Sequence, residues 1–506
     1  MKGLKIILAL LSFLVLVIVG FAQAKIIPVP TPEYPTIQDG IDAAVDGDTV
    51  LVADGTYTGT GNKNLDFKGK AITVTSENGA EDCIIDCESD GRGFIFQSGE
   101  GEESVVSGFT IQNGYVDDGG GILCSNSSPT ITNSIITNNF AAWAGGGINC
   151  SWDSSATITN NTIINNRSNG HGGGGIFLEK SSPIIDNNNI TNNSAAANGG
   201  GIFCYNNSSP TITNNNISDN SADWGGGIRC YTGGPSPTII NNIISGNSAI
   251  GGGGIDCGWW NDDVPIGPDL TIANNVIHSN SATWNAGISF ENSTLTVVNN
   301  TIANNFAEEK CGGIEVSVDS SITILNTILW RNIPDELYVD DTSVVDITYS
   351  DIQGGWPGEG NIDAEPLFVD PDSGDYHLTD YSPCIGAGIM TTDVPTEDFE
   401  GDPRPNPTES NPDMGADENP LAEPIPSING YVTDCQTGEP IKWALVIALQ
   451  KPDSSKVRVF TKRDGYYEIS DLEPGECWLI CIKRGYKLHI AKVEVPNRHD
   501  FCVEPK

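Results

Sequence analysis

Residues Gly225-Gly-Gly-Ile228-Arg-Cys230, Pro237-Thr-Ile-Ile-Asn-Asn242 and Ile244-Ser-Gly-Asn247 form one copy of a pattern that recurs through the middle of the chain. Each copy has a glycine run that ends in Ile, an Asn-Asn pair and an Ile-x-x-Asn motif. A repeat of this size indicates a solenoid. The isoleucines that close the glycine runs are Ile122, Ile148, Ile176, Ile202, Ile228, Ile255, Ile288 and Ile314, at steps of 26, 28, 26, 26, 27, 33 and 26 residues.

The repeat predicts strands and excludes helices. Each copy holds three short segments in which apolar and polar residues alternate, and no amphipathic helix can be drawn through them. Gly, Asn, Ser and Thr disfavour helix interiors, whereas Ile and Thr suit a pleated surface. Three strands and three turns per repeat predict one coil of a parallel β-helix, whose backbone groups pair with the coils above and below.

Two files of asparagines are expected along the solenoid. We expect the first Asn of each pair to bond its neighbours along the axis, and the second to adopt the left-handed conformation of a sharp bend. The first file is Asn133, Asn160, Asn187, Asn214, Asn241, Asn274, Asn299 and Asn326. The Ile-x-x-Asn motifs supply the second file, at Asn139, Asn166, Asn193, Asn220, Asn247, Asn280, Asn305 and Asn332. In the longest repeat, residues Trp259 to Pro268 are expected to form a loop.

Glycine runs that alternate with Ile-x-x-Asn resemble the repeat of polymorphic outer-membrane proteins and, more broadly, the pectin-lyase-like right-handed β-helix superfamily. The resemblance covers roughly residues 30 to 350. It implies a right-handed parallel β-helix. It leaves the function open, because this fold carries lyases, hydrolases, esterases, adhesins and inert stalks.

The first 24 residues predict a secretory signal peptide. Lys2 and Lys5 precede an apolar run from Ile6 to Val19, and Ala22-Gln-Ala24 offers a cleavage site. No later stretch is apolar enough to span a bilayer. We therefore expect a protein that is secreted or associated with the cell surface or outer membrane. The alternative, a membrane-spanning anchor, is disfavoured because the apolar run is short.

The net charge of −41, from 66 acidic and 25 basic residues, argues against nucleic acid as a partner. It also disfavours anionic lipid. By count, 12 basic and 12 acidic residues follow position 420, so the net charge belongs to the first 420 residues.

Thirteen cysteines in an exported protein raise the question of disulfides, although the count is odd. Cys124, Cys150, Cys204, Cys230 and Cys257 each lie two residues after the Ile of a glycine run, so they share the inward face. The same position holds Leu, Phe or Val in other copies, which favours a core file of free thiols. Oxidation between neighbouring coils remains open. Cys83 with Cys87, and Cys477 with Cys481, are each expected on one strand face.

Both ends of the solenoid need caps. With its two caps, the solenoid is expected to span residues 25 to 418. At the start, Ile37, Ile41 and Ala44 share one face of a predicted short helix, which is expected to cover the first coil. Residues 25–335 are assigned to the β-helix with this cap. Residues 336–418 are assigned to its last coils and a C-terminal cap, because the stretch from about 325 resembles a choice-of-anchor Q segment. Within it, Asp370, Asp372 and Asp375 alternate around a turn, so structural calcium or a plain acidic turn is expected there.

Residues 419–426 form a proline-rich linker. After it, short alternating strands between 428 and 495 predict a small β-sandwich over residues 427–506. Asp464-Gly-Tyr-Tyr467 and Leu472-Glu-Pro-Gly475 resemble the carboxypeptidase regulatory-like family, a transthyretin-like sandwich. The resemblance implies an accessory role and no catalytic residues. The fold class predicted for the whole chain is all-β.

The strand after each glycine run is the face on which β-helix enzymes hold polysaccharides. The residues predicted to point outward there are Leu123, Asn149, Phe177, Phe203, Arg229, Asp256, Ser289 and Glu315. Arg229 with Asp256 is the only fragment of a lyase-like arginine beside an acid. Glu291 and Glu315 are weak candidates for the two carboxylates of an inverting hydrolase. Gly170-His171-Gly172 lacks the clustered aspartates of polygalacturonases.

Aromatic residues flank the same strand on both sides. They are Trp143, Trp152, Tyr205, Trp224, Tyr231, Trp259 and Trp284. Rims of this kind predict a shallow trough in which rings stack on sugars, although bulky side chains that only shield the bends are the alternative. We therefore expect binding of a polysaccharide or surface glycan, as in an adhesin, without a cofactor other than calcium. A polysaccharide lyase or glycosidase and a non-catalytic stalk are the alternatives.

Overall fold

The computed structural model describes residues 24–231, 237–258, 270–292, 294–450, 455–470, 472–473 and 475–506. The predicted signal peptide, except its last residue, and the predicted loop from Trp259 to Pro268 lie outside these ranges. The chain forms two compact units. The first contains residues 1–238, 243–270 and 280–293. The second contains residues 239–242, 271–279 and 294–506.

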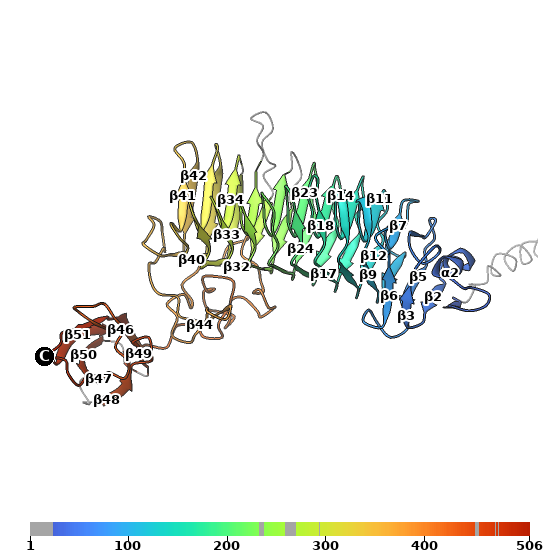
Figure 1. Cartoon of the computed structure of the whole chain (residues 1–506). Coiled ribbons are helices and arrows are strands. Elements are labelled where there is room, and N and C mark those ends of the chain that lie inside the picture. The colour runs from blue at the N-terminus through green and yellow to red at the C-terminus, as the bar shows by residue number, and fades with distance from the viewer. Residues whose placement is uncertain are drawn as a thin grey trace, which may run out of the picture. The chain divides into compact units, whose positions relative to one another are not determined.

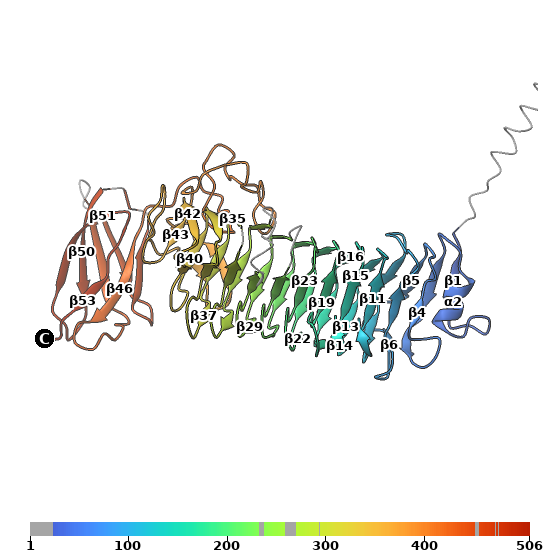
Figure 2. The same ribbon diagram turned by 90° about the horizontal axis from the view of Figure 1, so that it is seen from above.

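Three sheets of parallel strands build the coils, and each strand pairs with the equivalent strand of the neighbouring coil (Figures 1 and 2). The first sheet consists, in order, of β1 (Ile26–Val29), β2 (Thr49–Val52), β5 (Thr73–Ser76), β8 (Val105–Ser107), β12 (Thr130–Thr132), β16 (Thr157–Thr159), β20 (Ile184–Asp186), β24 (Thr211–Thr213), β27 (Thr238–Ile240), β31 (Leu270–Ala273), β35 (Thr294–Val298), β39 (Ser321–Leu325) and β42 (Val344–Thr348).

The second sheet follows the Asn-Asn pairs. It consists of β3 (Gly55–Tyr57), β6 (Cys83–Asp86), β9 (Thr110–Gln112), β13 (Ile135–Thr137), β17 (Thr162–Ile164), β21 (Asn189–Thr191), β25 (Asn216–Ser218), β28 (Ile243–Ser245), β32 (Val276–His278), β36 (Thr301–Ala303), β40 (Ile328–Trp330) and β43 (Asp351–Ile352). Its inward positions are filled mainly by isoleucine.

The third sheet follows the glycine runs and is called the Gly-Ile sheet below. It consists of β4 (Leu65–Asp66), β7 (Phe94–Phe96), β11 (Ile122–Ser125), β15 (Ile148–Ser151), β19 (Ile176–Glu179), β23 (Ile202–Tyr205), β26 (Ile228–Tyr231), β30 (Ile255–Cys257), β34 (Ile288–Glu291), β38 (Ile314–Ser317) and β41 (Leu337–Val339). Short strands extend some turns. These are β10 (Tyr115–Asp118), β14 (Phe140–Ala144), β18 (Arg167–Ser168) and β22 (Ser194–Ala195), and then β29 (Ser248–Ala249), β33 (Ser281–Ala282) and β37 (Phe306–Ala307).

The register confirms the predicted coil. In the first unit, Ile148 pairs with Ile176, and the same file continues through Ile202, Ile228, Ile255 and Ile288. All eight isoleucines of the repeat are fully buried. Stacked isoleucines thus form one side of the core, which is the right-handed parallel β-helix expected from the sequence.

Each glycine run is required by the close approach of neighbouring coils. Gly225 has a φ of +64°, which favours glycine. A Cβ on Gly226 would lie 2.6 Å from the carbonyl oxygen of Gly253, and one on Gly227 would lie 2.6 Å from that of Gly254. The first glycine therefore makes the turn, and the next two leave room for backbone from the next coil.

The asparagine prediction is wrong for the Asn-Asn pairs in one respect, which is the residue that has the left-handed conformation. The expected bond between first residues of successive pairs does occur, since Nδ2 of Asn187 donates to Oδ1 of Asn160 at 2.6 Å. The first Asn of every pair has a positive φ, as in Asn160 at 57° and Asn187 at 52°. The second Asn is buried and forms the ladder. The backbone N–H of Asn161 donates to Oδ1 of Asn188 at 3.0 Å, and its Nδ2 donates to the carbonyl oxygen of Ile131 at 2.9 Å. The first Asn of a pair, which has the positive φ, therefore points its side chain out of the coil. The side chain of the second Asn points into the coil.

The Ile-x-x-Asn ladder is confirmed. Asn166, Asn193 and Asn220 are buried, and each accepts the backbone N–H of the equivalent residue one coil earlier. Nδ2 of Asn193 also donates to the carbonyl oxygen of Ile163 at 2.8 Å. Each buried amide therefore satisfies main-chain groups at a bend that no strand can pair.

The N-terminal cap is also as predicted. Helix α2 (Ile37–Ala43) starts at Thr36, whose hydroxyl accepts the N–H of Asp39 in a capping box. Ile37, Ile41 and Ala44 are buried, and the helix contacts β1, β2 and β4. The helix therefore covers the apolar end of the first coil.

In the second unit, loops follow the last coil and contain one hairpin, β44 (Phe368–Asp370) with β45 (Asp375–Leu378). These loops are organised around Arg404, which is buried. Its Nε donates to Glu418 at 2.8 Å, its Nη1 to Oδ1 of Asn274 and its Nη2 to main-chain oxygens, including that of Ala416. One guanidinium thus connects a coil residue with the loops of the cap.

Residues from 428 onward form two sheets, of which the first is mixed and the second is antiparallel. One contains β46 (Ile428–Asp434), β49 (Tyr466–Ile469), β52 (Asn497–Arg498) and β53 (Phe501–Val503). The other contains β47 (Leu445–Gln450), β48 (Ser455–Phe460), β50 (Gly475–Ile482) and β51 (His489–Val495). Cys477 and Cys481 are both buried on one face of β50, as expected. The sequence therefore predicted this small sandwich correctly.

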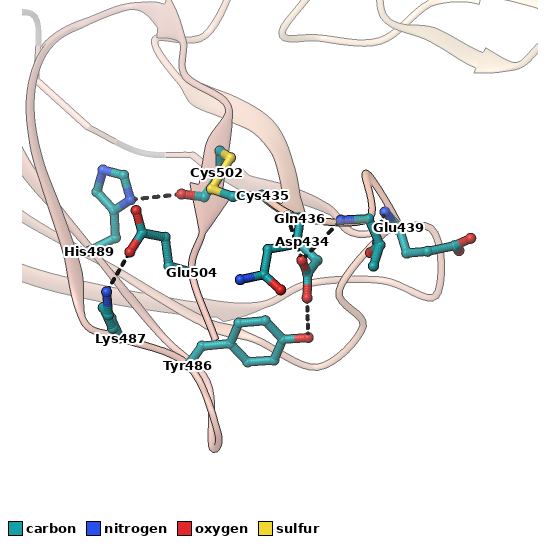
Figure 3. The surroundings of a disulfide bond; sticks show 10 residues. Asp434, Cys435, Gln436, Glu439, Tyr486, Lys487, His489, Cys502 and Glu504 are labelled. Carbon is teal, nitrogen blue, oxygen red and sulfur yellow. Dashed lines mark hydrogen bonds and ion pairs between the residues drawn. A yellow bond between two sulfur atoms is a disulfide. The ribbon is translucent and has the colours of Figure 1, made fainter. Parts of the chain in front are cut away.

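A disulfide joins Cys435, directly after β46, to Cys502 in β53 (Figure 3). It was not predicted. Around it, the hydroxyl of Tyr486 donates to Asp434 at 2.9 Å, and His489 bonds the carbonyl oxygen of Cys502 at 3.1 Å. The other eleven cysteines are unbonded thiols, and all are buried. Cys204, Cys230 and Cys257 share one register file, as expected for a core ladder.

No helix in the described part of the chain has the length and apolarity needed to cross a membrane.

Candidate ligand-binding site

The outward residues of the Gly-Ile sheet lie in one register file, but they are covered. Phe177 pairs with Phe203, Phe203 with Arg229 and Arg229 with Asp256. None of these four residues is more than 3% exposed. The sequence predicted an open polar floor here. The floor is instead buried, because larger side chains from both ends of the strands fold over it.

One row of side chains that cover the floor comes from the residues at the ends of the strands. Tyr205 pairs with Tyr231, and their rings stack in parallel with centroids 6.0 Å apart and an interplanar angle of 5°. Both rings pack against the cluster of Phe177 and Phe203. In the next coil the equivalent position is Gly258, which has no side chain. The aromatic row therefore ends at Tyr231, beside the place where Arg229 pairs with Asp256.

The second row of side chains that cover the floor comes from residues in or just before the glycine runs. Trp143 stacks on His171 with centroids 5.7 Å apart, and His171 meets Tyr205 edge to face at 4.5 Å. In later coils, Trp224 lies 5.4 Å from Trp284. Burial lowers the pKa of His171, which keeps its imidazole uncharged near neutral pH. These rings give the face an aromatic border along four coils.

Arg229 supplies a guanidinium to this face, in the register file between Phe203 and Asp256. Its guanidinium lies 5.4 Å from the ring centroid of Tyr231 and 5.9 Å from that of Trp224. It forms a buried ion pair with Asp256. Its Nε has no hydrogen-bond partner among the described residues. A buried donor that has no partner among the described residues can bind a ligand that enters beside it.

A cavity of about 460 Å³ lies above this arginine. Its lining includes His171, Asn198, Phe203, Asp223, Trp224, Arg229 and Tyr231. The volume falls within the ~300–1,000 Å³ typical of small-molecule sites. Apolar rings on the walls with a few polar groups are typical of such sites. A larger cavity, of about 870 Å³, lies in the second unit beside Arg331 and Glu365, which already form an ion pair.

The structure brings together most of the aromatic residues predicted from the sequence. Trp224 and Tyr231 line the cavity, while Tyr205, Trp284 and Trp143 contact its lining or its border. Trp152 is not among the described residues that line the cavity. It is 49% exposed and lies under the ammonium of Lys180, 4.4 Å from its ring centroid. Trp259 lies outside the described residues.

Sequence reasoning missed four lining residues, of which Ala197 is apolar and three are polar. Asn198 and Asp223 lie just before the glycine runs of their coils, and no motif distinguishes them from other polar turn residues. His171 was noted only for its resemblance to a catalytic motif. Its place between two glycines on the border of the aromatic row was the available signal.

The four catalytic candidates are placed differently. Arg229 and Asp256 are adjacent and buried, as described above. Glu291 lies beside Gly258, whose added Cβ would be 3.2 Å from its Oε2. Glu315 belongs to the second unit, where it is fully buried and pairs with Lys310 at 3.1 Å. A carboxylate buried beside a lysine is poorly placed to activate water.

The three aspartates predicted as calcium ligands lie in the hairpin of β44 and β45. Asp370 and Asp375 pair across its strands, and Oδ1 of Asp375 is 2.6 Å from Nδ1 of His377. Among the described residues, no group of three or more His, Cys, Asp or Glu side chains is arranged to hold a metal ion. Calcium at this hairpin stays a prediction.

Comparison with protein families agrees with this architecture. Residues 48–198, 95–267 and 172–329 match the right-handed β-helix region, and together they span more than half of the chain. The chain therefore belongs to the right-handed β-helix family. Residues 427–501 match the carboxypeptidase regulatory-like domain. The resemblances to polymorphic outer-membrane proteins and to choice-of-anchor Q segments stay predictions.

Solved structures with a similar fold include two kinds of lyase. Pectate lyase Pel9A has a TM-score of 0.46 and 14% identity, over 79% of this chain and 98% of that one. The PL6 family alginate lyase AlyGC has a TM-score of 0.35 and 14% identity, over 68% of this chain and 54% of that one. A point mutant of the same lyase has a TM-score of 0.36. No curated protein matches the sequence.

Proposed function

We propose that this chain is a non-catalytic carbohydrate-binding protein, whose site is the cavity between Trp224 and Tyr231. The observation that supports this proposal is the cavity itself. In it, aromatic rings lie beside a buried arginine whose Nε has no hydrogen-bond partner in the part of the chain that the structure describes. Sugar rings present apolar faces that stack on aromatic rings and hydroxyl groups that accept and donate hydrogen bonds. The partner is a polysaccharide or a surface glycan.

The predicted signal peptide supports a secreted or cell-surface location, where such glycans occur. In that setting the protein acts as an adhesin. The disulfide between Cys435 and Cys502 fits the same setting, because disulfides persist in oxidising compartments.

A polysaccharide lyase is the second candidate, favoured by the contact between Arg229 and Asp256. An arginine that removes a proton from a sugar must reach it without a competing acid. Here the guanidinium is 2% exposed and ion-paired. The arrangement therefore favours holding a ligand over attacking it.

The experiment compares binding by the wild-type protein and three variants. Tyr231→Ala and Trp224→Ala each remove one wall of the cavity, and Trp152→Ala is the matched control, an exposed tryptophan of the same solenoid outside the lining. Affinity electrophoresis through gels that contain single plant or microbial polysaccharides measures retardation. We expect the first two variants to lose about 10- to 100-fold in affinity, as one stacked ring typically contributes ~1–3 kcal/mol, and Trp152→Ala to bind as the wild type does.

Equal affinities for all four proteins would contradict the site. Release of unsaturated or reducing sugar ends from the same polysaccharides, with and without a chelator, would contradict the non-catalytic assignment. If no polysaccharide retards the protein in the gel, the remaining candidate function is that of a non-catalytic surface stalk.

A further inference from the structure

We infer that the cavity selects uncharged glycans and rejects polyuronates. This inference rests on the proposed function, since it specifies the ligand of the same site. It begins with the charge of the buried arginine. Arg229 lines the cavity, and its side chain forms an ion pair with that of Asp256; the two side chains are 3% and 4% exposed. The positive charge that would attract a carboxylate is therefore already compensated.

The border of the cavity adds a negative charge. Asp223 is exposed and lines the opening, and the imidazole of His171 is uncharged near neutral pH because burial lowers its pKa. Between Gly119 and Gly258 the chain carries six acidic and three basic residues. A uronate carboxylate that enters would approach Asp223 and would compete with Asp256 for the guanidinium. Both effects oppose an anionic ligand.

The hydrogen-bonding groups suit hydroxyls instead. Nε of Arg229 is a donor that has no hydrogen-bond partner among the residues described by the structure. Nδ2 of Asn198 donates to the carbonyl oxygen of His171 at 3.0 Å, which leaves its Oδ1 as an acceptor. The carboxylate of Asp223 is an acceptor at the opening. A sugar hydroxyl both donates and accepts, whereas a carboxylate at neutral pH only accepts. Two acceptors and one donor around the cavity therefore match a pair of hydroxyls better than a carboxylate.

The test measures the affinity of the full chain for matched polymers. Affinity electrophoresis uses neutral polymers (galactan, glucan, mannan and xylan) and polyuronates (polygalacturonate and alginate). We expect at least one neutral polymer to bind at least about tenfold more tightly than either polyuronate, because like charges at a binding site cost affinity. The difference should shrink at high salt, since the charge of Asp223 is exposed.

Two variants locate the cause of the selection. Asp223→Asn should lower the ratio of neutral to polyuronate affinity several-fold. Asp219→Asn is the control, because it makes the same charge change at an exposed turn of the same coil, outside the lining. It should leave the ratio as in the wild type. Asp256→Asn leaves Arg229 uncompensated and should raise polyuronate affinity. If Asp256→Asn does not fold, the comparison of Asp223→Asn with Asp219→Asn still tests the inference.

A polyuronate that binds as tightly as the best neutral polymer would overturn the inference while the proposed function stands. An unchanged ratio in Asp223→Asn would overturn it as well. Absence of binding to every polymer would instead overturn the proposed function.

Discussion

At the scale of single residues, the asparagines show both the reach and the limit of the sequence. Their spacing identified two ladders, and the Ile-x-x-Asn ladder is as predicted. Within the Asn-Asn pairs the left-handed conformation was assigned to the wrong residue, because the repeat fixes which residues stack but not their φ angles. Asn tolerates the left-handed region and also forms hydrogen bonds in stacks. The sequence is therefore compatible with the left-handed conformation at either residue of the pair.

The corrected assignment makes a direct prediction at Asn187 and Asn188. Asn188 is buried, accepts the N–H of Asn161 and donates to the carbonyl oxygen of Ile158 at 2.8 Å. Asn188→Ala should lower the free energy of unfolding by about 2–4 kcal/mol, because several buried main-chain partners are left unsatisfied. Asn187→Gly should change it by less than about 1 kcal/mol, since glycine adopts the same φ.

Urea unfolding followed by circular dichroism measures both variants, with hydrogen exchange at the amide of Asn161 as a local check. The original assignment predicts the opposite order. If Asn187→Gly lowers the free energy of unfolding more than Asn188→Ala does, the corrected assignment is contradicted and the original one is supported.

At the scale of structural elements, the regular coils were predictable and the irregular cap was not. The strands, the glycine turns and helix α2 follow from periodicity and capping signals in the sequence. The loops between 353 and 419 have no period, and their order depends on buried polar side chains such as Arg404. The partners of such a side chain come from distant segments, including Asn274, and no local pattern reveals them. The disulfide between Cys435 and Cys502 was missed for the same reason, as these residues are 67 apart in sequence.

The cap should be more stable in mild acid than in mild alkali. Burial raises the pKa of Asp413 to about 8 and that of Asp351 to about 7. Their unfolded-state pKa values lie near 4, so between pH 4 and 8 the folded protein binds more protons than the unfolded chain. Stability is then fully present below pH 4 and is lost as pH rises through about 8.

Hydrogen exchange of residues 376–418, corrected for the intrinsic pH dependence, measures this effect. Protection should be greater at pH 5 than at pH 8. In Asp351→Asn/Asp413→Asn the difference should diminish, because the amides mimic the protonated carboxyls. Greater protection at pH 8, or an unchanged difference in the variant, would contradict these pKa shifts.

At the scale of the whole molecule, the solenoid matters because it places equivalent residues in files, so that side chains from successive coils form one site. The sequence predicted the aromatic border through Trp224 and Tyr231, since files follow from the repeat. It did not predict that the border folds over the floor, which depends on side-chain directions. Nor did it reveal that Arg229 would be buried, with an Nε that has no hydrogen-bond partner within the described ranges.

The most direct test of the central claim is a crystal structure of the protein with an oligosaccharide from a polymer that it retains. We predict electron density for a sugar ring against Tyr231 or Trp224, with a hydroxyl within hydrogen-bonding distance of Nε of Arg229. Density for the sugar at any other place on the protein, with the cavity free of sugar, would contradict the account.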